Sequence, residues 1–387
     1  MGTVMADFLS KACSVTRFKV REEVTNEQLL AVPERLRQFA FVDIDNVPEV
    51  QAYGWVNFDD MLDAEWRVSP PEKGLYLTFA LRIDTRRISP AVLKKHYREA
   101  LEEEKKRLQA INNTFISRER RKEIKDQVKL RLLNRAMPIP ETHQVIWDPG
   151  KGIVMVSTAS GKVLDIFLTL FVRSFDVSLD QLEPREFAAF LLQEHDQQKV
   201  DMLEPAQFVA NNEHSSSLAD FLGKDFLTWL WWRSEVSPEF QTIKGEIFTL
   251  SMEQRVTVSG GDGITQEIAS VSGPLSGLRE ARVGLANGKK VTQCTLSCEK
   301  DGLSWQTSFN AMDLSARSLR CPRIENEGDD PDGVVLEKIY LMEVFFSMVD
   351  ALYNTFLVYR LSEEVWTDQV ENVQCWILEC GTSTGTA

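Results

Sequence analysis

Histidine and cysteine are scarce in this chain of 387 residues. It has four histidines and six cysteines, and neither type is clustered. Cys294-x-x-x-Cys298 and Cys375-x-x-x-x-Cys380 match no common zinc motif. The irregular spacing also predicts no disulfide framework, so we expect reduced thiols in a cytoplasmic protein, with no metal and no cofactor.

Segments that direct a chain to or through a membrane are also lacking. The first residues have no basic stretch followed by an apolar core, which a secretory leader requires. The longest apolar segment, residues 339–359, contains Glu343, Asp350 and Asn354, which would be costly in lipid. We therefore expect this segment to be a buried or interface helix.

Recognisable enzyme motifs are missing as well. The sequence contains no P-loop, no nucleophile elbow and no PD…ExK arrangement. Two pairs of adjacent acids, Asp59-Asp60 and Asp329-Asp330, could serve a metal-dependent nuclease, which needs clustered carboxylates near a phosphate. Adjacent acids on a loop are usually solvated, so we predict no catalytic residues and no enzyme, with a nuclease as an alternative.

Basic residues are also fewer than acidic residues in this chain. The chain has 44 Lys and Arg against 58 Asp and Glu, a net charge of −14. A protein that coats nucleic acid over its whole surface needs a basic balance, which this chain lacks. Any site for a polyanion must therefore be local.

The first part of the chain contains alternating patterns of strand and helix, with a Pro-Gly turn at residues 148–151. Apolar residues recur with the period of a strand or of a helix. The patterns predict strands at 14–20, 74–84, 143–147, 152–156 and 176–182, and helices at 26–39 and 160–173. This order indicates an α+β fold with mixed or antiparallel sheets and long helices.

Two long helices are predicted between these strands. Ser89 offers an N-cap and Pro90 a first helical residue, and Asn112, Asn113 and Thr114 break the pattern. A second helix begins near Ser117 and ends before Pro138. Together they predict a projecting helical hairpin over residues 90–137.

The second half has a different character. Trp229, Trp231 and Trp232 lie within four positions, and such density favours core or interface packing over stacking on exposed bases. Asn287-Gly288 and Asp301-Gly302 predict hairpin turns between strands over residues 283–314. An apolar helix is predicted at 334–361.

Three regions follow from these patterns. The ranges are an N-terminal α+β domain at 1–185 that includes the basic hairpin, a mixed and strand-rich region with the tryptophan cluster at 186–325, and a C-terminal long helix and tail at 326–387. An acidic loop at residues 325–333 marks the last boundary.

Positive charge is concentrated in the predicted hairpin. Residues 91–135 contain fourteen basic and seven acidic residues, a net charge of +7, which leaves −21 for the rest of the chain. On a helical wheel Ile124, Val128 and Leu132 form an apolar stripe. An arc of about 100° beside that stripe holds five cations, which are Arg118, Arg121, Lys122, Lys125 and Lys129.

Two interpretations of this charge remain open from composition alone. Cations at this spacing can contact successive phosphates without reading bases. Alternatively the helices are solvated and carry i,i+4 ion pairs, such as Glu102 with Lys106 and Glu103 with Arg107.

Several short motifs occur together in the first part of the chain. Gly54-Trp55-Val56 reads GWV, Ile88 to Lys94 reads ISPAVLK, and Lys125 to Ala136 reads KDQVKLRLLNRA. Trp147 with Gly152 to Val156 belongs to the predicted hairpin. These motifs resemble the GWV, the (L/I)-P-x-x-V-(I/L)-K helix start, the KDEV…LLPRA segment and the hairpin of the RdgC family, whose members are bacterial recombination-associated DNA-binding proteins. The resemblance covers roughly the first 180 residues, while Phe221 to Glu235 and the C-terminal tail depart from it.

The resemblance implies a subunit that pairs into a ring-shaped homodimer around double-stranded DNA, with little sequence preference. It further implies a nucleoid-associated protein that restrains RecA-promoted recombination and is not an enzyme. The matched motifs support Lys94, Lys125 and Arg135 as DNA contacts, and the cationic pattern adds Lys95, Arg98, Arg118, Arg121, Lys122 and Lys129. Met137, which ends a matched motif, is a candidate dimer contact.

A third class of function also fits the charge pattern. The acidic remainder of the chain could be the working surface of a protein-interaction scaffold that binds no DNA itself. A gel shift with duplex DNA at low salt distinguishes this scaffold from a DNA-binding protein.

Overall fold

The structure of the protein is a computed structural model. It describes residues 7–47, 49–110, 115–209, 221–242, 245–252, 255–260, 267–272, 275–324 and 330–379. Within these ranges the chain forms two compact units. The first contains Asn26–Pro71 and Thr78–Val145, and the second contains Ala6–Thr25, Glu72–Leu77 and Ile146–Ala387. The units therefore interleave along the chain.

The first unit is built on antiparallel strands. Strand β2 (Gln51–Val56) pairs with β4 (Tyr76–Arg86), with Trp55 opposite Leu81. Strand β5 (Pro138–Asp148) follows β4 in the sheet, and helix α1 (Asn26–Gln38) precedes β2 in the chain. The first-unit core contains the Trp55 and Phe79 rings, whose centroids lie 5.0 Å apart.

Gly54 allows another segment to approach the edge of this sheet. A Cβ atom at this position would lie 2.4 Å from the Cα atom of Phe41. The segment that contains Phe39 and Phe41 forms two main-chain hydrogen bonds with Trp55. The Trp55 N–H donates to the Phe39 carbonyl, and the Phe41 N–H donates to the Trp55 carbonyl. Only glycine has the space for this crossing.

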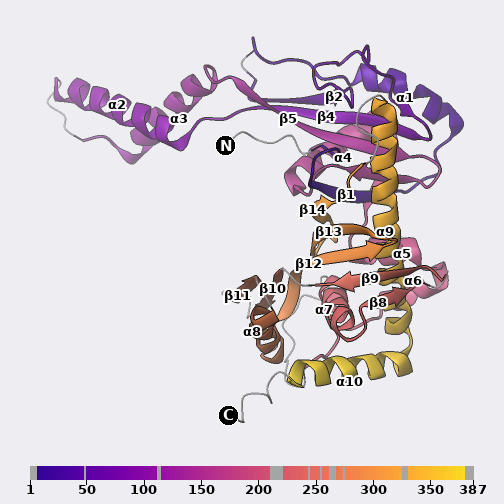
Figure 1. Cartoon of the computed structure of the whole chain (residues 1–387). Helices are drawn as coiled ribbons and strands as arrows, with labels where there is room; N and C mark the ends of the chain where they lie inside the picture. Colours follow the sequence, from indigo (N-terminus) through magenta and orange to yellow (C-terminus); the bar gives the residue numbers. More distant parts are fainter. Residues whose placement is uncertain are drawn as a thin grey trace. The chain divides into compact units, whose positions relative to one another are not determined.

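Helices α2 (Pro90–Gln109) and α3 (Arg118–Leu133) form the predicted hairpin of the first unit. They lie side by side and extend beyond the strands of that unit (Figure 1). The Ser117 hydroxyl accepts from the Arg120 N–H at 3.1 Å, which caps the start of α3. The predicted break at Asn112 to Thr114 lies outside the described residues.

The second unit contains a larger antiparallel sheet. Its strand order is β11 (Glu267–Ser272), β10 (Arg255–Gly260), β12 (Lys290–Lys300), β13 (Leu303–Asn310), β14 (Ala316–Arg320), β1 (Cys13–Val20) and β6 (Ile153–Val156). Further pairings add β7 (Leu179–Gln181) to β1, β9 (Ile247–Ser251) to β12, β8 (Glu239–Gln241) to β9 and β3 (Glu72–Lys73) to the start of β4. Asp301 and Gly302, at φ 53° and 77°, form the turn between β12 and β13.

Seven helices described in the second unit pack with this sheet and with one another. They are α4 (Gly161–Phe175), α5 (Pro184–Leu191), α6 (Glu194–Val200), α7 (Phe221–Val236), α8 (Leu275–Ala286), α9 (Pro331–Leu361) and α10 (Glu363–Glu379). Of the described helices, α9 is long and apolar enough to cross a membrane, and 56% of its most apolar window is buried.

The polar residues of α9 are accommodated inside the second unit. The Asp350 carboxylate lies 2.8 Å from the Arg17 guanidinium, and Glu343 lies 2.6 Å from the Lys151 ammonium. The Arg17 guanidinium is also 4.3 Å from the centroid of the Phe346 ring. The prediction of a buried helix is therefore confirmed.

The α+β prediction is confirmed, with long helices and antiparallel strands. One turn prediction is wrong, because residues 283–286 are the end of α8 and not a strand. Gly288, at φ 83°, ends that helix, and the Lys289 N–H donates to the Gly284 carbonyl at 3.0 Å. Helix α10 replaces most of the predicted tail, and the residues after Glu379 lie outside the described ranges.

Candidate nucleic-acid interface

The α2–α3 hairpin has a thin apolar interior. Helix α3 buries Ile124 and Val128, whereas α2 buries no residue fully. Leu101 and Leu108 of α2 are half-buried. Because this interior is small, most hairpin side chains are in contact with water. Each charged side chain either forms an ion pair at the surface or has no partner.

One group of charges is paired between and along the two helices. The Arg120 guanidinium lies 2.8 Å from Glu104 and 3.0 Å from Glu123. The hydrogen bond from Arg120 lowers the pKa of Glu104, and the same bond raises the pKa of Arg120. Arg107 lies 3.7 Å from Glu104, and Lys105 lies 2.8 Å from Glu102. The interpretation as paired charge is therefore correct for this group, with i,i+3 pairs within each helix and the Arg120–Glu104 pair between them. The described ion pairs do not include the two i,i+4 pairs expected from the sequence, Glu102 with Lys106 and Glu103 with Arg107.

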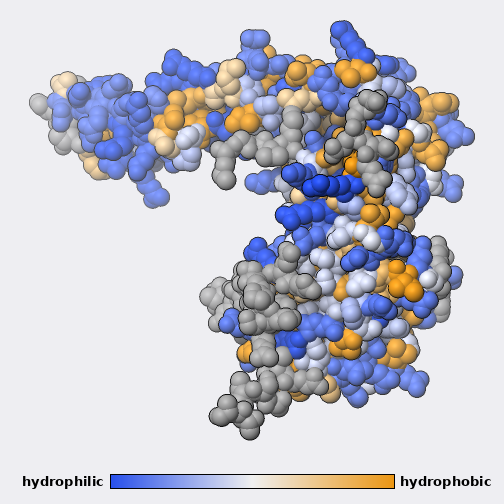
Figure 2. All heavy atoms as spheres, viewed as in Figure 1, coloured by the Kyte–Doolittle hydropathy of each residue, from blue (hydrophilic) through white to orange (hydrophobic). Residues whose placement is uncertain are grey.

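A second group of cations is open, by which we mean exposed to water and without a carboxylate partner among the described residues. We call Arg118, Arg121, Lys122, Lys125 and Lys129 the cationic face of α3. All five side chains are exposed. Among the described residues, no carboxylate lies within ion-pair distance of any of them. Figure 2 shows hydrophilic residues over most of the hairpin on the side in view.

The candidate cations of α2 are exposed, but one of them lies close to a carboxylate. Lys94, Lys95 and Arg98 all face water. Lys95 lies 3.9 Å from Glu99, whose carboxylate also lies 2.9 Å from the His96 imidazole. This proximity reduces the positive field of Lys95 more than that of Lys94 or Arg98.

The remaining two candidates follow the end of α3. Arg135 is exposed, and 74% of Met137 is exposed. Met137 is therefore not a core methionine of this chain. Other apolar side chains of the hairpin segment are exposed as well, with Val92 at 43%, Phe115 at 72% and Leu130 at 61%. Single exposed apolar side chains are ordinary on a protein surface, so these four residues by themselves do not identify a partner surface.

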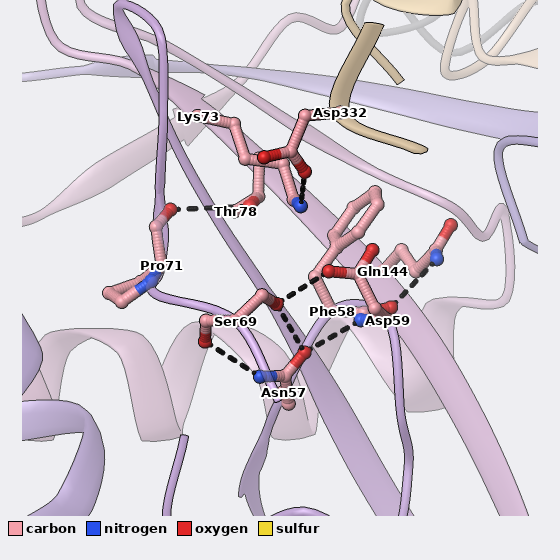
Figure 3. A network of polar contacts seen from close by, with 9 residues as sticks. All are labelled: Asn57, Phe58, Asp59, Ser69, Pro71, Lys73, Thr78, Gln144 and Asp332. Atoms are coloured by element: carbon pink, nitrogen blue, oxygen red, sulfur yellow. Dashed lines mark hydrogen bonds and ion pairs between the residues drawn. The ribbon is translucent and has the colours of Figure 1, made fainter. Parts of the chain in front are cut away.

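The paired acids considered for a nuclease are part of an ordered loop. The Asn57 side-chain oxygen accepts from the Asp59 N–H at 2.8 Å and from the Ser69 hydroxyl, which also donates to the Asp59 carboxylate (Figure 3). The Asp60 carboxylate accepts from the Leu62 N–H at 2.9 Å. Both acids therefore have structural hydrogen bonds, while Asp329 lies outside the described residues.

Asp63 organises the rest of that loop. Partial burial acts to raise the pKa of Asp63, but hydrogen bonds from the N–H groups of Val68, Glu65 and Arg67 outweigh this effect and lower that pKa.

Among the residues that the structure describes, no group of three or more His, Cys, Asp or Glu side chains could hold a metal ion.

The tryptophan cluster is buried. Trp229 and Trp231 have no exposed surface, and Trp232 is 8% exposed. The Trp229 indole donates to Gln369 at 3.1 Å, and the Trp231 ring packs edge-on against Trp376 of α10. The preference for core packing is confirmed, because buried rings cannot stack on bases.

Sequence reasoning missed Arg86, which lies directly before the hairpin. Its side chain is only 6% exposed and donates to five backbone carbonyl groups. No sequence pattern indicates this role, since the acceptors are main-chain atoms far apart in the chain.

Comparison with known proteins identifies the family. The family model described as "Putative exonuclease, RdgC" matches residues 11–215, more than half of the chain. The match includes the β1 strand, the whole α2–α3 hairpin and the loop at residues 57–69. No curated protein matches the chain. On the extent of the family match, this protein belongs to the RdgC family.

Proposed function

We propose that this protein binds double-stranded DNA without sequence preference, through the cationic face of α3, and does not hydrolyse it. The observation that carries the proposal is the set of five exposed cations that have no carboxylate partner among the described residues. Family membership and the α2 cations Lys94, Lys95 and Arg98 support it.

The dimensions of α3 suit a duplex backbone. Arg118 and Lys129 are separated by eleven residues, about 16 Å along a helix. A duplex carries roughly ten phosphate charges over that length. Cations that contact these phosphates release counterions and gain affinity for any sequence alike. The negative balance of the remaining chain disfavours binding elsewhere and would confine DNA to the hairpin.

We propose further that the protein acts as a ring-shaped homodimer, as its resemblance to the RdgC family implies. The exposed apolar residues Val92, Phe115, Leu130 and Met137 are the candidate contacts with a second copy. In such a dimer two cationic faces would engage one duplex. Each copy would raise the effective concentration of the other, which increases avidity without new contacts.

The biological consequence follows from occupancy of DNA. A protein that covers duplex without regard to sequence competes with other proteins for the same phosphates. We propose that this protein restrains RecA-type recombination in this way, as a nucleoid-associated protein of the cytoplasm.

Charge reversal on α3 tests the proposal. The triple variant Arg121→Glu, Lys125→Glu, Lys129→Glu should bind duplexes of several sequences more than about tenfold more weakly, with equal losses for all of them. Fluorescence anisotropy with labelled duplexes measures the Kd. Unchanged affinity of a folded triple variant would exclude the cationic face as the binding surface.

The control variant makes the same change in net charge at another place. Lys11, Lys162 and Arg323 are exposed residues of the second unit. Their replacement by glutamate should weaken binding far less than the α3 reversal, because these residues are not part of the proposed phosphate-contacting face. Equal losses in both variants would show that net charge alone governs the affinity.

A nuclease is the second candidate, and the description of the matching family model favours it. The test is incubation of an end-labelled duplex with the protein and Mg²⁺. Degradation that disappears in an Asp59→Asn, Asp60→Asn variant would establish the nuclease. An intact duplex that remains bound is the result that the DNA-binding proposal expects.

A further inference from the structure

Arg86 occupies an unusual position for a charged residue. It is the last residue of β4, it is 6% exposed, and no described carboxylate pairs with it. Its Nε donates to the Glu49 carbonyl at 3.0 Å. A second nitrogen donates to the Ile44, Asp45 and Val47 carbonyls at 2.8, 3.1 and 3.2 Å. The side chain therefore fixes the 44–49 segment to the end of β4.

The third nitrogen of Arg86 reaches the other end of the hairpin. It donates to the carbonyl of Ala136, which lies two residues beyond the C-cap Asn134 of α3. Arg86 thus joins the residue where the chain leaves the sheet toward α2 with the residue where it returns from α3.

A weaker contact lies at the same place. Arg87 pairs with Glu141 of β5 at 2.9 Å, but 59% of the Arg87 side chain is exposed. Exposed ion pairs of this kind hold geometry weakly. The two neighbouring arginines therefore differ sharply in how firmly they can fix the base of the hairpin.

Packing within the helices cannot fix the direction of the hairpin. Helix α2 buries no residue fully, and the two fully buried residues of α3 are Ile124 and Val128. Side-chain packing of α2 and α3 holds the helices to each other. Their orientation on the first-unit strands depends on the residues at the base, where Arg86 makes the largest number of the hydrogen bonds described.

We infer that Arg86 is the positioning residue of the hairpin, which holds the cationic face of α3 in a fixed direction for the duplex. The inference rests on the DNA-binding function proposed above. A rigid hairpin presents its cations already ordered, so binding does not have to order them. Arg86 itself is buried and contacts no phosphate, so its contribution is separate from the charge of the face.

The conservative variant Arg86→Lys tests this role. Lysine keeps the charge but has three donors on one nitrogen, and it cannot span the same five carbonyls. Spin labels at Leu30→Cys in α1 and Gln109→Cys in α2 report the direction of the hairpin by pulsed electron paramagnetic resonance. The exposed Cys375 and the half-buried Cys321 are replaced by serine, as is Cys380, so that only the two introduced thiols react. Labelled protein is diluted with unlabelled protein.

Three results are expected together. The distance distribution of Arg86→Lys broadens, the Kd for duplex rises about three- to tenfold, and the salt dependence of the Kd keeps its slope because the phosphate contacts are the same. The matched control Arg87→Lys leaves the distribution and the Kd at the level of the parent protein. A folded Arg86→Lys variant with an unchanged distribution, or with a broadened distribution and an unchanged Kd, would overturn the inference.

A second variant keeps the inference testable if Arg86→Lys does not fold. Insertion of two glycines between Arg135 and Ala136 leaves every hydrogen bond of Arg86 available but separates α3 from the Ala136 carbonyl. The same broadening and the same loss of affinity are expected, and their absence contradicts the inference. If the parent protein binds no duplex at all, the proposed function fails, whereas the distance distributions still decide whether Arg86 fixes the hairpin.

Discussion

The arginines of β1 and α3 differ in what surrounds their charge. Arg17 in the second unit is 10% exposed, pairs with Asp350 and lies between the rings of Phe187 and Phe346. Arg121 in the first unit is exposed and has no described carboxylate partner. A paired, buried cation contributes to stability and has nothing left to offer a ligand. An open cation contributes little to folding and remains available to phosphates.

The largest expected effect of this difference is on stability. Arg17→Ala should lower the free energy of unfolding by about 2–4 kcal/mol, since it leaves the Asp350 carboxylate without its partner. This carboxylate is 28% exposed in the folded chain, which keeps the expected loss below that of a fully buried pair. Burial already raises the pKa of Asp350, so the unpaired acid should take up a proton more readily. Urea denaturation measures the loss.

A double variant serves as the control for Arg17. Arg17→Met with Asp350→Leu removes both charges and should recover much of the lost stability. If the double variant is as unstable as Arg17→Ala, the ion pair is not the source of the effect and the contacts of Arg17 with the rings are.

An intermediate effect is expected from a buried acid. Desolvation raises the pKa of Asp225 to about 6, against the opposing influence of Lys290 at 4.0 Å and of the Ala206 N–H at 2.7 Å. The folded chain therefore binds this proton more tightly than the unfolded chain. Stability from this group is greatest below about pH 4 and declines as the pH rises through 6, by up to about 3 kcal/mol.

Comparison of variants isolates the titration of Asp225. Asp225→Asn retains an acceptor for the Ala206 N–H and should flatten the pH dependence of unfolding between about pH 4 and 7. The exposed Asp165, replaced by asparagine, should leave the curve of the parent protein unchanged. Parallel curves for Asp225→Asn and the parent protein would contradict the assignment.

The smallest expected effect on stability comes from two neighbouring arginines of the hairpin. Arg120→Gln breaks the partly exposed pairs with Glu104 and Glu123 and should lower the melting temperature slightly, with the salt dependence of duplex binding unchanged. Arg121→Gln should leave the melting temperature unchanged but reduce the salt slope by about 0.9. Identical DNA binding by the two variants would remove the distinction between paired and open cations.

Patterns local in the sequence predicted much of this fold. Ser117 and Pro138 bracket α3, and Asp301-Gly302 makes the β12–β13 turn, because these residues satisfy backbone requirements within a few positions. Asn287-Gly288 misled the prediction for the same reason. A hairpin turn and a helix C-terminus both require positive φ, so the local signal is shared, and packing of α8 on the sheet decided between them.

The candidate site was predictable only where it depends on helix periodicity. The cationic face of α3 follows from residues three and four apart, which lie on one side of any helix. Helix periodicity does not show which cations lack a carboxylate partner. Arg120 and Arg121 are the same residue type at adjacent positions, and they differ only in their contacts in the folded chain. The roles of Arg120 and Arg86 depend on acceptors on another helix or on distant main-chain carbonyls. Such contacts exist only after folding.

The salt dependence of duplex binding tests the central claim most directly. We predict that neutralising three open cations, in Arg121→Gln, Lys125→Gln, Lys129→Gln, reduces the slope of log K against log salt by about 2.7 relative to the parent protein. The reduction should be the same for duplexes of unrelated sequence. A parent slope near zero, or an unchanged slope in the triple variant, would contradict the claim that the cationic face of α3 grips the phosphate backbone.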